Sequence, residues 1–168
     1  MVLSKDEFLT ALRHEVHIVL HLASKAEPKM LDYRPTAKQR SLIELLQYFT
    51  LVGPIHLRAT LNPTFDMNGW RDSWRTGEAK AKTLDLEQVK AVIAQLPRQF
   101  AEMLEPCSDS DLRAEIEMFG RRASRGSMMV SLVLSHYSAY RMQLFLYLKS
   151  CGREELNTLN LWAGMDAP

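Results

Sequence analysis

The sequence predicts an all-α protein in which four long helices form a bundle, over about 5–25, 42–61, 86–105 and 126–151. Each of the first three ranges begins with a capping box, in which two side chains three positions apart satisfy free backbone N–H groups. The fourth range ends at Gly152, and glycine is the preferred residue where a helix ends in a left-handed turn. Helices of this length with both short and long connections are typical of a four-helix bundle.

The chain of 168 residues is expected to form one domain, 1–168, because this length is enough to bury a substantial core. Pro54 lacks the N–H that an internal helical residue donates, so we expect a kink or a break in the second helix. Pro97 does the same to the third helix, which then forms one bent helix or two shorter pieces. The three capping boxes are Ser4 with Glu7, Ser41 with Glu44, and Asp85 with Gln88.

The two longer connections are expected to be mostly irregular. Residues 62–83, NPTFDMNGWRDSWRTGEAKAKT, contain turn-forming residues and two tryptophans, which indicates a long connection with partial order at best. Residues 112–120, LRAEIEMFG, alternate polar and apolar side chains, which indicates a short extended segment.

The charges are nearly balanced, with 21 Lys and Arg against 20 Asp and Glu and a formal net charge of +1. No long-range field therefore favours nucleic acid or an anionic membrane as a partner. The most apolar stretch, 126–148, contains His136, Arg141 and Gln143 and is too polar for an ordinary membrane span. The two cysteines form no disulfide framework, and the N-terminus MVLSKDEF is unlike a signal peptide. We therefore expect a cytoplasmic protein.

Three histidines of the first helix, His14, His17 and His21, share a polar face opposite the expected core face. Residues three and four apart are neighbours on a helix, so these side chains could clamp a metal ion at the surface. The favoured interpretation is a solvated polar face or part of a dimer contact, because histidine is commonly found at protein surfaces.

A helical wheel with about 100° per residue places His136 near the centre of the apolar face of the fourth helix, and Tyr140 one turn further on the same side. On the second helix, His56 points inward and Tyr48 lies at the edge of the inward face, although Pro54 could rotate His56 away. The other inward residues are Met129, Val133 and Tyr147 on the fourth helix and Leu45, Phe49 and Val52 on the second.

An inward His136 beside tyrosine hydroxyls has two interpretations. It belongs either to a buried cluster whose polar groups hydrogen-bond one another, or to a metal or substrate pocket in the bundle core. The spacing alone favours the buried cluster, because a metal site normally needs three protein ligands and only one good ligand can be named.

Two stretches of the sequence resemble one known superfamily. YRPTAKQRSLIELLQYF at 33–49 resembles the loop and second helix of the DinB-like (DinB/YfiT) superfamily, and SHYSAYRMQLFLYLK at 135–149 resembles its last helix. The similarity extends to the first helix and to the tail NLWAG. It implies a four-helix bundle with long crossover connections, commonly found as a homodimer. Several such proteins are thiol-dependent S-transferases or metal-dependent hydrolases, and many carry zinc or nickel on three histidines.

The resemblance implies that the histidine triad of this chain is incomplete. The ligand position of the second helix falls on Tyr48, and the two positions of the last helix fall on His136 and Tyr140. Phenols are protonated at neutral pH and are poor ligands for zinc or nickel, although ferric iron can bind phenolates. After Arg141, the usual glycine is replaced, while Gln143 is retained.

We therefore expect a metal-free or weakly metal-binding bundle with a small polar pocket at Tyr48, His136 and Tyr140, in which Gln143 extends the hydrogen bonding. Its expected partners are a second copy of the chain and a small molecule. The alternative is a metal-dependent thiol S-transferase or hydrolase that holds zinc or nickel through His136 and His56. A purely structural bundle is a third hypothesis. The sequence does not decide whether the pocket is catalytic, because no nucleophile motif accompanies it.

Overall fold

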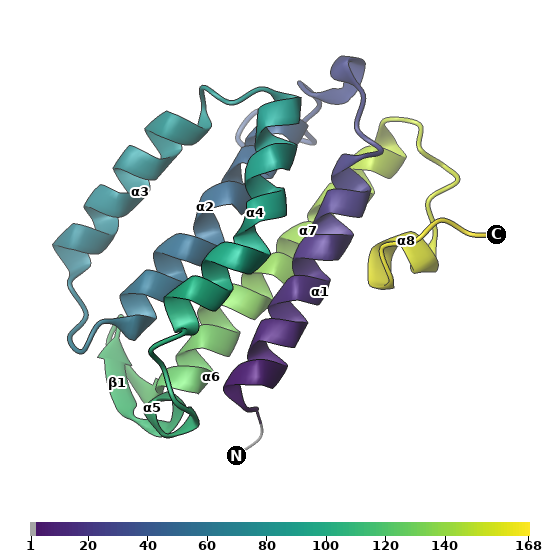
Figure 1. Ribbon diagram of the computed structural model, residues 1–168. Helices are drawn as coiled ribbons and strands as arrows, with labels where there is room; N and C mark the ends of the chain where they lie inside the picture. The colour runs from purple at the N-terminus through teal and green to yellow at the C-terminus, as the bar shows by residue number, and fades with distance from the viewer. Residues whose placement is uncertain (1–2) are drawn as a thin grey trace.

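The computed structural model describes residues 3–168 and consists mainly of helices (Figure 1). Four long helices pack around a common core: α1 (Lys5–Ala23), α2 (Leu42–Leu61), α4 (Leu86–Leu104) and α7 (Ser135–Ser150). Both α1 and α2 pack against α4 and against α7, so each of them lies between the other two helices. The prediction of an all-α bundle is confirmed. Within the described residues, no helix is sufficiently long and apolar to cross a membrane.

All three predicted capping boxes are formed, at the starts of α1, α2 and α4. Of the kink or break expected at Pro54, the break does not occur, because α2 continues through this residue, and α4 likewise continues through Pro97. Residues on both sides of each proline are fully buried, namely Val52 and Leu57 in α2 and Leu96 and Phe100 in α4. Burial of one such side chain contributes roughly 1.5–3 kcal/mol, comparable with the ~3 kcal/mol that an internal proline costs.

The expectation of an irregular connection over 62–83 is also wrong, because most of it forms the helix α3 (Met67–Ala81). The Asp66 side chain caps this helix by accepting a hydrogen bond from the Asn68 N–H (3.0 Å). At Gly77 the helix approaches α2 so closely that a Cβ atom would lie 3.3 Å from Cδ1 of Ile55. In Figure 1, α2 and α4 run in the same direction and α3 returns the chain between them, so α3 is the long crossover.

Within the segment predicted at 112–120, residues 115–118 are confirmed as extended and form one strand of a hairpin. Strand β1 (Glu115–Met118) pairs antiparallel with β2 (Arg121–Ser124). The two turn residues, Phe119 and Gly120, have φ values of 54° and 72°, as the right-handed twist of a hairpin favours. The remaining short helices are η1 (Pro28–Met30), α5 (Asp109–Arg113), α6 (Arg125–Met129) and α8 (Thr158–Trp162).

The last long helix contains a π-helical turn, η2 (Val130–Leu134), between α6 and α7. A π turn rotates less per residue than an α turn, so one helical wheel does not describe both sides of it. In α7, Tyr137, Leu144 and Leu148 are fully buried, whereas His136 and Tyr140 are half-buried. The placement of His136 at the centre of the apolar face is therefore wrong. It lies at the edge of that face, toward α2.

The opposite edge of the same face is turned toward α1. There the guanidinium of Arg141 is 4% exposed, and its Nε lies 3.4 Å from Oε2 of Glu15 on α1. The other oxygen of this carboxylate accepts a hydrogen bond from Ser138 (2.9 Å). Because α7 packs on two helices at once, its buried face is broader than a single stripe, and His136 belongs to the part that meets α2.

Candidate functional site

The predicted pocket residues come together where α2 and α7 pack against each other. The ring centroids of Tyr48 and Tyr140 lie 4.7 Å apart, and those of His56 and His136 lie 5.0 Å apart. Tyr48 and His56 are about two turns apart on α2, and His136 and Tyr140 are one turn apart on α7. The packed helices therefore set two pairs of rings side by side. We call Tyr48, His56, His136 and Tyr140 the inner cluster.

Two tryptophans of α3 cover the inner cluster. The Trp74 ring stacks on Tyr48, with centroids 5.6 Å apart and planes 19° from parallel, and it meets His56 edge-on at 5.5 Å. Trp70 lies 6.0 Å from both His56 and Trp74. The sequence contained one signal for this arrangement, since two tryptophans four positions apart share a face if the segment is helical. That signal was missed because the segment was expected to be irregular.

Gln143 was expected to extend the hydrogen bonding of the pocket at Tyr140. It instead contacts the loop before α2 through Tyr147. Its amide donates to the hydroxyl of Tyr147 (2.5 Å), which in turn donates to the backbone carbonyl of Arg40 (3.1 Å). The guanidinium carbon of Arg40 lies 4.1 Å from the centroid of the Tyr48 ring. A guanidinium in this position is attracted by the ring electrons. Gln143 and Tyr147 therefore hold the backbone of Arg40, whose guanidinium lies over a ring of the inner cluster.

Burial favours the uncharged forms of His56, His136 and Tyr48. Burial lowers the pKa of His56 to about 4, with a smaller contribution from His136. Burial also lowers the pKa of His136, although the nearby backbone carbonyls of Ser131 and Leu132 act in the opposite direction. Burial, with a further contribution from Tyr140, raises the pKa of the Tyr48 hydroxyl. The cluster therefore offers neutral imidazoles and the protonated phenol of Tyr48 as hydrogen-bonding groups.

Three polar atoms in and around the cluster are buried and have no hydrogen-bond partner in the described chain: Nδ1 of His56, Nε1 of Trp70 and Nε1 of Trp74. The His56 side chain is only 5% exposed. A buried polar group without a partner costs about 1–3 kcal/mol, so most such groups in folded proteins are paired. A bound molecule that forms hydrogen bonds with these three groups would remove this free-energy cost.

Two solved structures have this architecture. A DinB-like protein from Bacillus cereus matches with a TM-score of 0.70 and 15% sequence identity, over 90% of this chain and 95% of that one. A DinB-like protein from Bacillus subtilis matches with a TM-score of 0.66 and 17% identity, over 89% of this chain and 94% of that one. The chain has the DinB-like fold. No protein-family model and no curated protein matches the sequence.

The residues at this place in the DinB-like fold do not fit a divalent metal held by three protein ligands. Only two imidazoles are present, those of His56 and His136. In the chain from residue 3 to residue 168, no three histidine, cysteine or carboxylate side chains are grouped so as to hold a metal ion. The remaining members, Tyr48 and Tyr140, are phenols, and zinc and nickel bind protonated phenols poorly.

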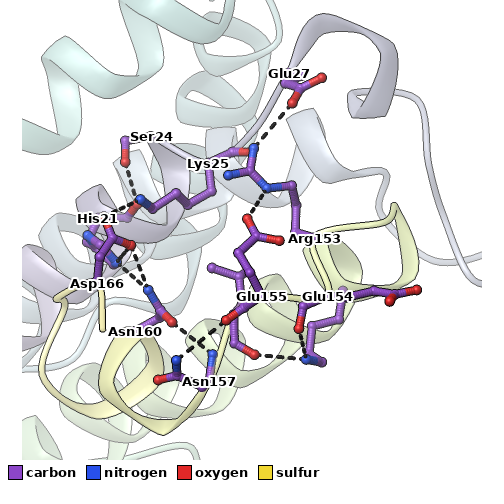
Figure 2. A network of polar contacts seen from close by, with 12 residues as sticks. His21, Ser24, Lys25, Glu27, Arg153, Glu154, Glu155, Asn157, Asn160 and Asp166 are labelled. Carbon is purple, nitrogen blue, oxygen red and sulfur yellow. Dashed lines mark hydrogen bonds and ion pairs between the residues drawn. The ribbon is translucent and has the colours of Figure 1, made fainter. Parts of the chain in front are cut away.

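The histidine face of α1 lies outside this site and contacts the C-terminal segment of the same chain. Nε2 of His14 lies 3.0 Å from the carbonyl oxygen of Trp162, and a Cβ atom at Gly164 would lie 2.7 Å from the ring of His17. Figure 2 shows His21 beside Asn160 (3.0 Å) and Asp166 (3.6 Å). His14 and His17 are exposed, as expected of a polar face, and no three metal-binding side chains are grouped within residues 3–168. The face also anchors the C-terminal segment.

Proposed function

We propose that the protein binds a small molecule at the inner cluster and at the cavity beside it, without using a metal ion. One observation carries this proposal: Tyr48 belongs both to the inner cluster and to the wall of a cavity of about 320 Å³. Small-molecule sites in proteins commonly have volumes of about 300–1,000 Å³ and combine apolar walls with a few polar groups.

The cavity lies between the loop that precedes α2, the N-terminal half of α2 and the C-terminal end of α3. Its inner wall is formed by Tyr48 and Leu51 of α2 and Ala81 of α3. Arg40 lies between the cavity and the inner cluster, because its guanidinium covers the Tyr48 ring. A ligand in the cavity would therefore be in reach of both an aromatic surface and a cation.

Binding is favoured over nucleophilic catalysis because no activated nucleophile accompanies the cluster. A reactive cysteine has a lowered pKa. Burial raises the pKa of both cysteines in this chain, Cys107 and Cys151, and neither of them lines the cavity. The hydroxyl of Tyr48 likewise has a raised pKa, so it serves as a hydrogen-bond donor rather than as an anion.

The alternative is a metal-dependent thiol S-transferase or hydrolase that uses His56 and His136 as altered ligands. The short distance between these two rings supports it. A metal site normally needs three protein ligands, and the third would have to come from a phenol. The alternative therefore has weaker support than metal-free binding.

A fragment screen followed by the indole N–H signals in a nitrogen-15 correlation spectrum tests the proposal. The chain has three tryptophans, so these signals can be assigned by single Trp→Phe variants. Trp74 stacks on Tyr48, whereas Trp162 lies on α8 and is 57% exposed. We expect bound fragments to shift the Trp74 signal and to leave the Trp162 signal unchanged. A library of mixed charge that leaves Trp74 unshifted while the protein is folded would refute the proposal.

A further inference from the structure

We propose that the ligand of this cavity carries an anionic oxygen group, a carboxylate or a phosphate, which is held by Lys38, Arg40 and Lys82. This inference rests on the proposed function, because it assigns a chemical class to the molecule that the cavity binds. It follows from the charges around the cavity, from the two sides on which they lie and from the apolar wall behind them.

The cavity lining is positively charged. Four basic side chains and two acidic ones line the cavity, which leaves a surplus of two positive charges. Among residues 3–168, Arg34 is the only one of the four basic residues that forms an ion pair, with Glu44 at 3.4 Å. The same Glu44 oxygen also accepts the backbone N–H of Ser41 (2.7 Å). Lys38, Arg40 and Lys82 thus remain unpaired, with Glu78 as the one acidic residue left beside them.

The three unpaired cations come from two different segments that border the cavity. Lys38 and Arg40 lie on the loop before α2, and Lys82 lies on the opposite wall, at the C-terminal end of α3. An N-terminus of α2 and a C-terminus of α3 meet at the cavity, so the two helix dipoles largely offset each other there. The side-chain charges therefore dominate the local field. Two lysines and an arginine that face one space from two sides are arranged to hold an anion between them.

Arg40 is held in position before any ligand binds. Its carbonyl accepts the hydrogen bond from Tyr147, and one face of its guanidinium lies on the Tyr48 ring. A guanidinium stacked by one face still presents its N–H groups at its edge, in the planar fork that suits carboxylate and phosphate. A residue that is already ordered loses less conformational entropy on binding.

The apolar part of the cavity wall indicates what the rest of the ligand is like. Tyr48, Leu51 and Ala81 give the cavity an apolar wall, so the ligand should have an apolar or aromatic body besides its anionic group. The volume of about 320 Å³ is at the lower end of the range for small-molecule sites. A compact organic anion therefore fits the site better than a polymer does.

A titration with benzoate, phenyl phosphate and neutral benzamide, followed at the Trp74 indole signal, tests this inference. We expect the two anions to bind about tenfold more tightly than benzamide, because a hydrogen bond to a charged group contributes about 1.5–3 kcal/mol. The double variant Lys38→Gln/Lys82→Gln should lose about tenfold in anion affinity. Both lysines are exposed, so the substitutions should leave the fold intact.

A matched control removes the same number of charges outside the cavity. Lys80 lies on α3 two residues before Lys82, Lys90 lies on α4, and neither lines the cavity. The variant Lys80→Gln/Lys90→Gln should retain the wild-type affinity for both anions. Equal affinities for benzoate and benzamide, or full anion affinity in Lys38→Gln/Lys82→Gln, would overturn the inference and leave the proposed binding function standing. If neither these compounds nor any library fragment shifts Trp74, both proposals fail.

Discussion

Of the two imidazoles of the inner cluster, His56 is the more deeply buried. It is 5% exposed, its Nδ1 has no partner among the described residues, and burial lowers its pKa to about 4. Its neutral form is therefore the form compatible with the folded protein over most of the pH range. In the unfolded chain His56 is in water and can bind a proton freely. The protonation of His56 therefore makes the stability of the folded chain depend on pH.

We predict that His56 makes the protein less stable as the pH falls from about 6.5 to about 4. A histidine in the unfolded chain has a pKa of about 6.5, so below this pH the unfolded state binds a proton that the folded state excludes. The effect is present in full near pH 4 and amounts to about 3 kcal/mol, since one pKa unit corresponds to about 1.4 kcal/mol. Urea unfolding of the wild type and His56→Phe between pH 7.5 and 4.5 measures it.

The free energy of unfolding of the wild type, relative to His56→Phe, should decline with falling pH. His14→Phe is the matched control, because it makes the same substitution at an exposed position of α1 outside the inner cluster. Parallel stability curves for the wild type and His56→Phe would contradict the lowered pKa.

At the scale of single residues, the sequence predicted which side chains meet but not what surrounds them. Tyr48, His136 and Tyr140 could be assigned to one place because the resemblance to the DinB-like superfamily aligns them with residues of one site, and the structure brings their rings together. Arg40 and Trp74 could not be assigned, because both reach the cluster from segments whose path depends on tertiary packing. The lowered pKa of His56 likewise depends on that covering and cannot be deduced from its own helix.

The helix α3 determines whether the inner cluster is open or covered. Only one of its residues, Ala81, is buried, so most of its side chains face solvent. A helix of 15 residues is only marginally stable alone in water, and α3 therefore depends on its contact with α2. At Gly77, a Cβ atom would be in close contact with Ile55 and Leu51 of α2.

We predict that Gly77→Val separates α3 from α2 and lowers the free energy of unfolding by about 1–3 kcal/mol, the usual cost of overfilling a packed interface. A Cβ atom at this position would lie 3.3 Å from Cδ1 of Ile55, and the branched side chain adds two methyl groups. Chemical denaturation measures the change. Ala79→Val introduces the same side chain at an exposed position of α3 and should cost much less. If the two variants prove equally stable, α3 is not packed as described.

At the scale of elements, local signals predicted the helix starts and failed where packing decides. The capping boxes act between residues three apart, so they can be read directly. The regularity of α2 through Pro54 and the existence of α3 are tertiary effects, because burial on other helices offsets a proline or two glycines. The π turn of η2 also has no simple sequence pattern. The helical wheel did not include it and therefore misplaced His136.

At the scale of the whole molecule, the DinB-like fold brings α2 and α7 into contact and places the inner cluster between them. The homodimer implied by the resemblance stays a proposal, which light scattering at micromolar concentration can test. Its support is a set of exposed apolar side chains on the outer sides of α7 and α8, namely Met142, Leu146, Leu159 and Trp162. The C-terminal segment lies against α1 through Asn160 and Asp166, as Figure 2 shows.

The central claim is that this DinB-like bundle binds its ligand without a metal ion, and metal content tests it most directly. The purified protein is incubated with excess zinc, nickel or iron, dialysed and analysed for metal per chain, beside His136→Ala and a His14/His17/His21 triple alanine variant. We predict far less than one equivalent of each metal, unchanged in His136→Ala, with any residual metal lost in the triple variant. About one equivalent in the wild type that disappears in His136→Ala would contradict the claim.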